Sequence, residues 1–214
     1  MPYFITIQYP YQDIIITLSH DRTILASQTI SKIQAVGQLL PTCDQLLIEQ
    51  NLLLSDIHCI GINTGPGPFN TLRSIIATAN GIAFASKIPL IGSNGLDLIL
   101  DNTDEHTVAI LDAFGTDVYF AIKAYGKQGY TSIENLMEEL NNLYAGKVLM
   151  FVGNGTTKHQ DFLAQNFAGI AKFHGDLAFA TTQSLIDATY KKFLAHETSQ
   201  ELFPLYFASP IKKP

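Results

Sequence analysis

The segment from residue 69 to residue 86, FNTLRSIIATANGIAFAS, constrains the fold most, because it has the period of a helix and a single charged residue. At 100° per residue, small residues gather on one side and bulky apolar residues on the other. A surface helix of a monomer has a charged face, so we expect both sides to be covered. The bulky side suits the chain's own sheet, and the small side lets another helix backbone come close. Residues predicted on or beside the small side are Arg73, Ser74, Ala77, Thr78, Gly81 and Ala85.

A neighbouring helix is predicted over residues 31–50, with Ser31 as its N-cap and a kink or division at Pro41. Its apolar residues recur at alternating steps of three and four, the spacing of a helix that packs on another helix. We therefore predict a partner interface made by residues 31–50 and 69–86. The alternative is a helix 69–86 buried wholly within one subunit. The predicted contact residues of the first helix are Ile33, Val36, Leu40, Cys43 and Leu47.

Composition supports a covered apolar surface. Apolar residues make up 47% of the 214 residues and charged residues 15%, which leaves little polar surface for the exterior. The net charge is −6, and the chain has no basic stripe of the kind that unaided nucleic-acid binding needs. The first residues lack the pattern of a signal peptide and no apolar run is long enough to cross a bilayer, so a cytoplasmic protein is expected. Cys43 and Cys59 are expected to be reduced and buried.

The order of the expected helices and strands predicts a duplicated α/β architecture. A three-stranded meander comes first, then helices alternate with strands, and a hairpin near His106 starts a weaker copy of the pattern. We predict an N-terminal subdomain of residues 1–104 and a C-terminal subdomain of residues 105–214. Strands are expected near 4–7, 14–18, 23–25, 57–62, 89–92, 108–111, 118–123 and 147–152. Further helices are expected at 95–101, 132–143, 157–166 and 181–196, with a tight turn at 153–155 and an irregular tail from 203.

A glycine-rich turn, Gly65-Pro66-Gly67-Pro68, precedes the helix 69–86. Such a turn can cradle a phosphate, but a Walker loop needs a Lys that is absent here. The dinucleotide fingerprint is absent too, because Thr71 stands where its last Gly belongs. The simpler interpretation is that the glycines permit positive φ and that Pro68 begins the helix.

Catalytic patterns are sparse. The six histidines form no H-x-x-x-H or H-E-x-x-H pair, so a metal site and a metallopeptidase are unsupported. No G-x-S-x-G elbow occurs, although a triad dispersed along the chain stays open. Asp112 follows a strand, where a carboxylate acts as a ligand or base or, more often, closes a turn. We expect no catalytic residue, no metal and no cofactor.

The motif GPGPFNTLR resembles the G-P-G-S-F-T-G-x-R motif of the TsaB family, also called YeaZ. The segments QLLPTCDQLL, LDAFGTDVYFAI, VGNG and PLYFASP resemble further family segments in the same order. The resemblance implies an actin, sugar-kinase and Hsp70-like fold of two ribonuclease-H-like subdomains. It also implies the non-catalytic partner of TsaD in forming threonylcarbamoyladenosine at position 37 of tRNA. The family pairs through the two helices named above, and TsaE is its ATPase; self-pairing stays open, and tRNA is reached only through the complex.

Departures from the family pattern bear on the rival function, an ATP-dependent kinase or ATPase of the same fold. Gln8 replaces an Asp that, in catalytic members of the superfamily, helps to hold the nucleotide's metal, and an amide is a poor ligand for a hard cation. Pro68, Thr71 and Phe114 replace Ser, Gly and Arg of the motifs, and Asp117 stands for Glu. These changes disfavour a ligand bound through those positions, and they leave open an altered partner surface.

Overall fold

The computed structural model describes residues 1–9 and 11–207, which form two compact units. Unit 1 comprises Met1–Asn94 and Thr181–Leu205. Unit 2 is formed mainly by Gly95–Ala180. The contacts thus divide the chain at residue 95 and return residues 181–205 to unit 1, unlike the predicted limits of 1–104 and 105–214.

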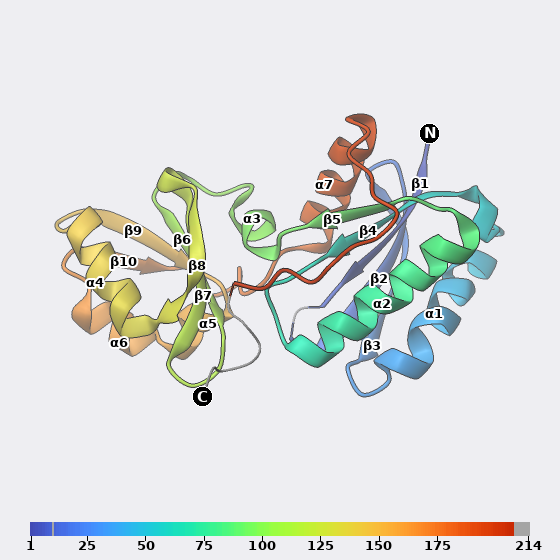
Figure 1. Cartoon of the computed structure of the whole chain (residues 1–214). Coiled ribbons are helices and arrows are strands. Elements are labelled where there is room, and N and C mark those ends of the chain that lie inside the picture. Colours follow the sequence, from blue (N-terminus) through green and yellow to red (C-terminus); the bar gives the residue numbers. More distant parts are fainter. Residues whose placement is uncertain (10, 208–214) are drawn as a thin grey trace. The chain divides into compact units, whose positions relative to one another are not determined.

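Unit 1 is built on a mixed sheet in the order β3-β2-β1-β4-β5 (Figure 1). The predicted meander is present, with β1 antiparallel to β2 and β2 antiparallel to β3, while β1, β4 and β5 run parallel. Apolar alternation explains the layers, because successive strand residues point to opposite faces. The strands are Tyr3–Gln8 (β1), Asp13–His20 (β2), Thr23–Ser31 (β3), Ile57–Asn63 (β4) and Leu90–Ser93 (β5).

Helices cover both faces of this sheet. Helices α1 (Ala35–Glu49) and α2 (Phe69–Ser86) lie together on one face, over the main core. Helix α7 (Thr182–Leu194) packs on the other face, where Tyr190 and Phe193 contact a small cluster of Phe4, Cys59 and Ile91. A short 3-10 helix, η1 (Leu54–Asp56), leads into β4.

Unit 2 has its own five-stranded sheet, in the order β10-β9-β6-β7-β8. Strands β6, β7 and β8 form an antiparallel meander, and β9 and β10 add in parallel to β6. Its core joins the apolar face of α4 to β6, β7 and β9. The elements are α3 (Gly95–Leu100), β6 (Thr107–Asp112), β7 (Asp117–Ile122), η2 (Lys123–Tyr125), β8 (Lys127–Ser132), α4 (Ile133–Tyr144), β9 (Val148–Val152), α5 (Asn154–Lys158), α6 (Gln160–Asn166) and β10 (Ile170–Phe173).

Several local predictions are wrong. Ser31 does not cap α1, because β3 pairs with β2 as far as Ser31 opposite Asp13 and the helix begins at Ala35. Pro41 lies inside α1 without dividing it. Strands β8 and β10 were not predicted, and the predicted helix 157–166 is two short helices. No helix within residues 1–9 and 11–207 is long and apolar enough to cross a membrane.

Candidate functional site: the surface of helices α1 and α2

The small side of α2 lies on the surface of unit 1. Ala77, Gly81 and Ala85 are exposed, and Ser74 and Thr78 are half-buried. A Cβ added to Gly81 would meet no heavy atom within 4 Å. The small side is therefore not packed inside the subunit, as the alternative interpretation of this helix required.

The bulky side of α2 packs on the chain's own sheet, as predicted. Leu72, Ile75, Ile76, Ala79 and Ala83 are all buried. Their burial removes the apolar side from water and holds α2 on β4 and β5. The small side is thereby directed outward.

The apolar stripe of α1 is divided between core and surface. Leu40 is 53% exposed and Ile33 is 88% exposed, so both are available to a partner. Cys43 and Leu47 are only 5% and 4% exposed and belong to the core of unit 1, which corrects their predicted place in an interface. The side chain of Val36 lies outside the described residues.

A groove of about 550 Å³ runs between α2, α1 and η1. Leu40 forms one wall, Leu54 lies beside it, and the C-terminal half of α2 forms the other wall. Leu54 was missed by the sequence analysis, because a residue of a 3-10 turn has no helical period to reveal it. The α2 residues that line the groove are Thr78, Gly81, Ile82, Ala85 and Ser86.

The polar groups of this groove are already bonded within α2. Thr78 Oγ1 donates to the carbonyl of Ser74 at 2.9 Å, and Ser86 Oγ donates to the carbonyl of Ile82 at 2.7 Å. None of the described residues that line the groove has a charged side chain. The groove therefore presents an apolar surface with no directed hydrogen bond for a polar ligand.

Two cations flank the small side of α2. The Arg73 guanidinium lies 4.9 Å from the centre of the Phe69 ring, and the Lys87 ammonium lies 4.8 Å from that of Phe84. Phe84 is 79% exposed, so an aromatic ring and its cation stand in water at the C-terminal end of the helix. Residues 69–87 contain no carboxylate.

The Gly-Pro turn fixes where α2 begins. Gly65 has a φ of +107°, and a Cβ there would lie 2.7 Å from Leu72 Cδ2, so only glycine fits. Gly67 has neither restriction. Pro68 is the N-cap residue and the helix starts at Phe69. The turn thus has a packing role that accounts for Gly65.

Two acidic residues of unit 2, Asp112 and Asp117, accept hydrogen bonds from neighbouring side chains. Lys158 Nζ donates to Asp112 Oδ1 at 2.6 Å and to the carbonyl of Gly115 at 2.7 Å, which closes the loop after β6. Tyr130 donates to Asp117, and this hydrogen bond raises the pKa of Tyr130 to about 12. The Lys158 bonds close the β6–β7 turn, which agrees with the turn-closing role considered for Asp112. The Tyr130–Asp117 bond instead links β8 to β7.

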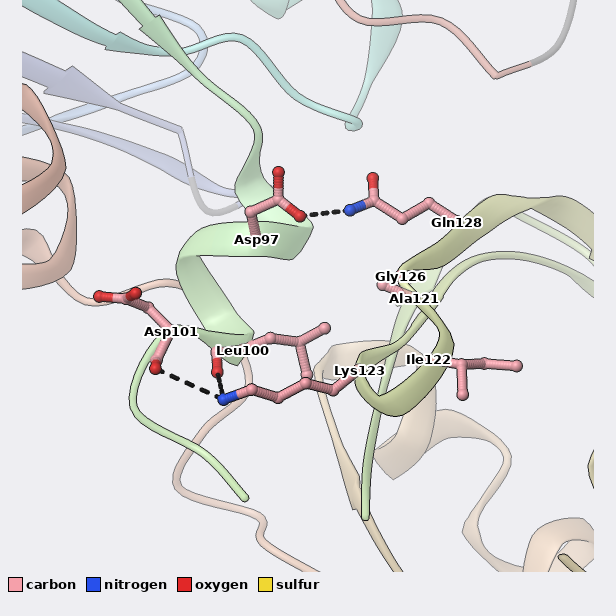
Figure 2. Close-up of a pocket in the computed structure, with 8 residues that line it drawn as sticks. All are labelled: Asp97, Leu100, Asp101, Ala121, Ile122, Lys123, Gly126 and Gln128. Atoms are coloured by element: carbon pink, nitrogen blue, oxygen red, sulfur yellow. Dashed lines mark hydrogen bonds between the residues drawn. The ribbon is translucent and has the colours of Figure 1, made fainter. Parts of the chain in front are cut away.

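A second pocket, of about 220 Å³, lies within unit 2 between α3 and the end of β7 (Figure 2). Lys123 Nζ donates to the backbone carbonyls of Leu100, Asp101 and Thr103, and so caps the C-terminal end of α3. Asp97 accepts a hydrogen bond from Gln128 across the rim. The Lys123 ammonium is therefore already bonded to backbone carbonyls at the end of α3. The hydrogen bond between Gln128 on β8 and Asp97 on α3 attaches this helix to the sheet of unit 2.

The described residues give little support for a cysteine nucleophile or for a metal site. Burial raises the pKa of the Cys43 and Cys59 thiols to about 12, so neither is the thiolate that a nucleophile requires. No group of three or more His, Cys, Asp and Glu side chains with metal-binding geometry occurs within the described part of the chain.

Comparison with known protein families shows to which family this chain belongs. The model of the TsaD family, described as tRNA N6-adenosine threonylcarbamoyltransferase, matches residues 24–206. The chain belongs to this family. The Haemophilus influenzae protein named tRNA threonylcarbamoyladenosine biosynthesis protein TsaB is 23% identical over 210 residues, which span 87% of this chain and 83% of that protein. Together with the structural match to YeaZ given next, it confirms the predicted resemblance to TsaB.

Solved structures agree on the fold of this family member. YeaZ from Pseudomonas aeruginosa matches 96% of this chain and 100% of its own, with a TM-score of 0.73 and 20% identity. The Listeria monocytogenes protein Lmo2764, described as a candidate N-acetylmannosamine kinase, matches 91% of this chain and 99% of its own, with a TM-score of 0.55 and 12% identity. The predicted fold class, shared with the sugar kinases, is confirmed.

Proposed function

We propose that this chain is the partner subunit of a TsaD-type enzyme that forms N6-threonylcarbamoyladenosine in tRNA, and that it supplies a binding surface and no catalytic group. Family membership supports the pathway. The observation that carries the partner role is the uncovered small side of α2, where a Cβ added to Gly81 would meet no heavy atom within 4 Å. A TsaE-type ATPase is the further component that the resemblance implies, and tRNA is met only in the assembled complex.

The exposed apolar residues around this side support the proposal. Leu40, Leu53 and Phe84 are 53%, 70% and 79% exposed, all near the two helices or the turn that follows α1. Apolar side chains left in water in this concentration mark a surface that another protein covers. Covering them removes apolar area at about 25 cal/mol per Å², which favours association.

Pairing with the host's TsaD-type subunit tests the proposal. The two chains are co-expressed with a tag on one of them, and the purified material is compared with the isolated chain by sedimentation velocity. We expect one complex of fixed stoichiometry. The modified nucleoside in cellular tRNA should also fall when this chain is depleted. Failure to pair, together with unchanged tRNA modification in depleted cells, would contradict the proposal.

Gly81→Leu places the test on the helix itself. A bulky side chain holds two helix backbones apart, and overpacking of a close contact costs about 1–3 kcal/mol, which is roughly ten- to more than a hundred-fold in affinity. Because the site is open in the subunit and Leu has the higher helix propensity, the variant should melt no lower than the natural chain. A variant that melts lower and still pairs normally would mean that the interface lies elsewhere.

A further inference from the structure

We infer that the outer edge of β3 pairs with the same edge of a second copy of this chain, antiparallel and with Thr29 on the two-fold axis. β3 is the last strand of the sheet of unit 1, and within the described residues no strand pairs with its outer side. This edge takes no part in the proposed contact with a TsaD-type subunit, so the two contacts can be tested separately.

The outer edge of β3 lacks the features that usually protect an edge strand. Protected edge strands are short or carry charged residues or proline. β3 is 9 residues long, TILASQTIS, and contains neither a charged residue nor a proline. Its register shift against β2 lies between Leu18 and Ser19, so the ladder from Ala26 to Ser31 is regular. This regular stretch can therefore act as a template for another strand.

The hydrogen bonds to β2 indicate which backbone groups of β3 face outward. Lys32 N donates to the Gln12 carbonyl at 3.2 Å, in the same register as the ladder of β2 and β3. Residues of an antiparallel strand alternate in the side to which their N–H and C=O groups point. Every second residue back from Lys32 therefore bonds to β2. The N–H and C=O groups of the residues between them, Ser27, Thr29 and Ser31, point away from β2.

Side-chain contacts agree with this direction. Thr17 of β2 lies opposite Ser27, and their hydroxyl oxygens are 2.9 Å apart. Side chains approach closely in this way in a pair that exchanges no backbone hydrogen bonds. Ile30 is 8% exposed and belongs to the core of unit 1, and Ala26 packs against that core. The strand is thus held in place by its inner face, so pairing requires little further ordering of its backbone.

The sequence of this edge is complementary to itself. With Thr29 on the axis, the two Thr29 residues lie opposite each other and Ser27 lies opposite Ser31 of the second copy. Each outward N–H then meets an outward carbonyl, and hydroxyl side chains face one another, a combination that favours strand pairing. A two-fold contact of this kind closes on itself, so it produces a dimer and not a filament.

Charge supports a second copy as the occupant. The chain has a net charge of −6, so two copies repel where their acidic residues meet. Residues 23–31 carry no charge, and Lys32 comes opposite Ala26 of the second copy and not opposite another lysine. The β3 edge is therefore a place where two copies can approach without like charges.

Opposite charges on the axis test both the place and the register. Thr29→Lys sets two ammonium groups opposite each other and Thr29→Glu sets two carboxylates, so each variant alone should dimerise about tenfold more weakly than the natural chain, or worse. An equimolar mixture of the two variants should restore pairing, because the charges then attract. Sedimentation velocity over a range of concentrations measures the dissociation constants, and equal melting temperatures show that the subunit is intact.

Thr23 provides the matched control. It is exposed on the same strand but lies outside the paired residues. Thr23→Lys and Thr23→Glu should change dimerisation much less, and their mixture should gain nothing over either variant alone.

Amide hydrogen exchange gives a second measurement. When the protein concentration is raised, the amides of Ser27, Thr29 and Ser31 should become protected, because they acquire carbonyl partners. The amides of Gln28 and Ile30 already bond to β2 and should change little.

Three results would overturn the inference. The first is a natural chain that stays monomeric at every concentration. The second is a mixture of the Thr29 variants that pairs no better than either alone. The third is self-pairing that is lost in Gly81→Leu, on α2, and kept in Thr29→Lys. None of these results changes the affinity for a TsaD-type subunit, which tests the proposed function by itself.

Discussion

The side-chain amide of Asn80 brackets the backbone of Leu202. Its Nδ2 donates to the Leu202 carbonyl at 2.9 Å, and its Oδ1 accepts from the Leu202 N–H at 2.9 Å. Asn80 lies on α2 and Leu202 on the segment after α7, so one side chain fastens the end of unit 1 to the helix whose other side faces water. Leu205 N donates to the Thr64 carbonyl at 2.8 Å and continues the attachment.

Asn80→Ala should release this segment. Both hydrogen bonds are lost and two backbone groups of Leu202 lose their partners, so we expect the free energy of unfolding to fall by about 1–3 kcal/mol. Hydrogen exchange of residues 199–205 should accelerate before the rest of unit 1 opens. Asn80→Asp separates the two bonds, because it keeps an acceptor for the Leu202 N–H but places a carboxylate oxygen, which cannot donate, against the Leu202 carbonyl. Unchanged hydrogen exchange in the alanine variant would show that the two Asn80–Leu202 hydrogen bonds do not stabilise this segment.

Gly61→Ala and Gly81→Ala should act in opposite directions. A Cβ at Gly61 would lie 2.8 Å from Thr189 Cγ2, between β4 and α7, and such overpacking costs about 1–3 kcal/mol. Gly81 is open, so alanine there should stabilise α2 by about 0.5–1 kcal/mol through the helix propensity. Urea unfolding of both variants measures the difference. A loss of stability in Gly81→Ala would mean that the small side of α2 is packed within the subunit.

Acid should weaken the connection between the β2–β3 turn and α7. Arg22 donates to both carboxylate oxygens of Asp187 at 2.8 Å, and this hydrogen bonding holds the pKa of Asp187 below its usual range. A carboxyl whose pKa is lowered by folding contributes its full stability above its unfolded pKa, roughly 3.9, and loses it as pH falls through the folded value. Asp187→Asn should therefore be less stable than the natural chain near pH 6, and the two should converge in strong acid. A constant difference across this range would exclude titration of Asp187 as the cause.

Magnesium-ATP should bind weakly to the isolated chain. Gln8, 3% exposed at the end of β1, offers no negative charge, and the Lys158 ammonium already lies against Asp112. Isothermal calorimetry should show no micromolar binding. Micromolar affinity that disappears in Gln8→Ala would favour the kinase or ATPase function instead.

Transfer RNA should bind poorly to the isolated chain as well. With a net charge of −6 and scattered lysines, the chain lacks the cations that release counterions from a phosphate backbone. Fluorescence anisotropy with labelled tRNA at physiological salt provides the measurement. Tight binding with a steep salt dependence would point to a direct role in holding RNA.

The sequence predicted correctly which side of α2 is buried, but it did not predict which residues of α1 are exposed. Both results have one physical reason. A helical period gives the direction of each side chain about the axis but does not name the neighbour on that side. Cys43 and Leu47 fit a stripe with Leu40, yet they point into the core while Leu40 reaches the surface. Burial of a helix edge depends on the tilt of the helix against the sheet, which is set by contacts distant in the sequence.

Strands β8 and β10 were not predicted because their formation also depends on contacts distant in the sequence. Strand β8, KQGYTS, is polar and contains a glycine, and β10, IAKF, has four residues. Both exist because an existing strand offers its edge, β7 to β8 and β9 to β10. Ser31 was misassigned as a helix cap because pairing with β2 extends the strand beyond its apolar part. Local patterns do not contain this pairing energy.

The return of α7 to the first sheet has a consequence for synthesis on the ribosome. The face that Phe4 and Ile91 share with α7 is complete only after residues 181–194 emerge, about 90 residues after β5. At the usual elongation rate, this interval lasts roughly 5 to 20 seconds. During that time unit 2 finishes translation while one apolar face of the first sheet stands open, so this face of the nascent chain is exposed to aggregation.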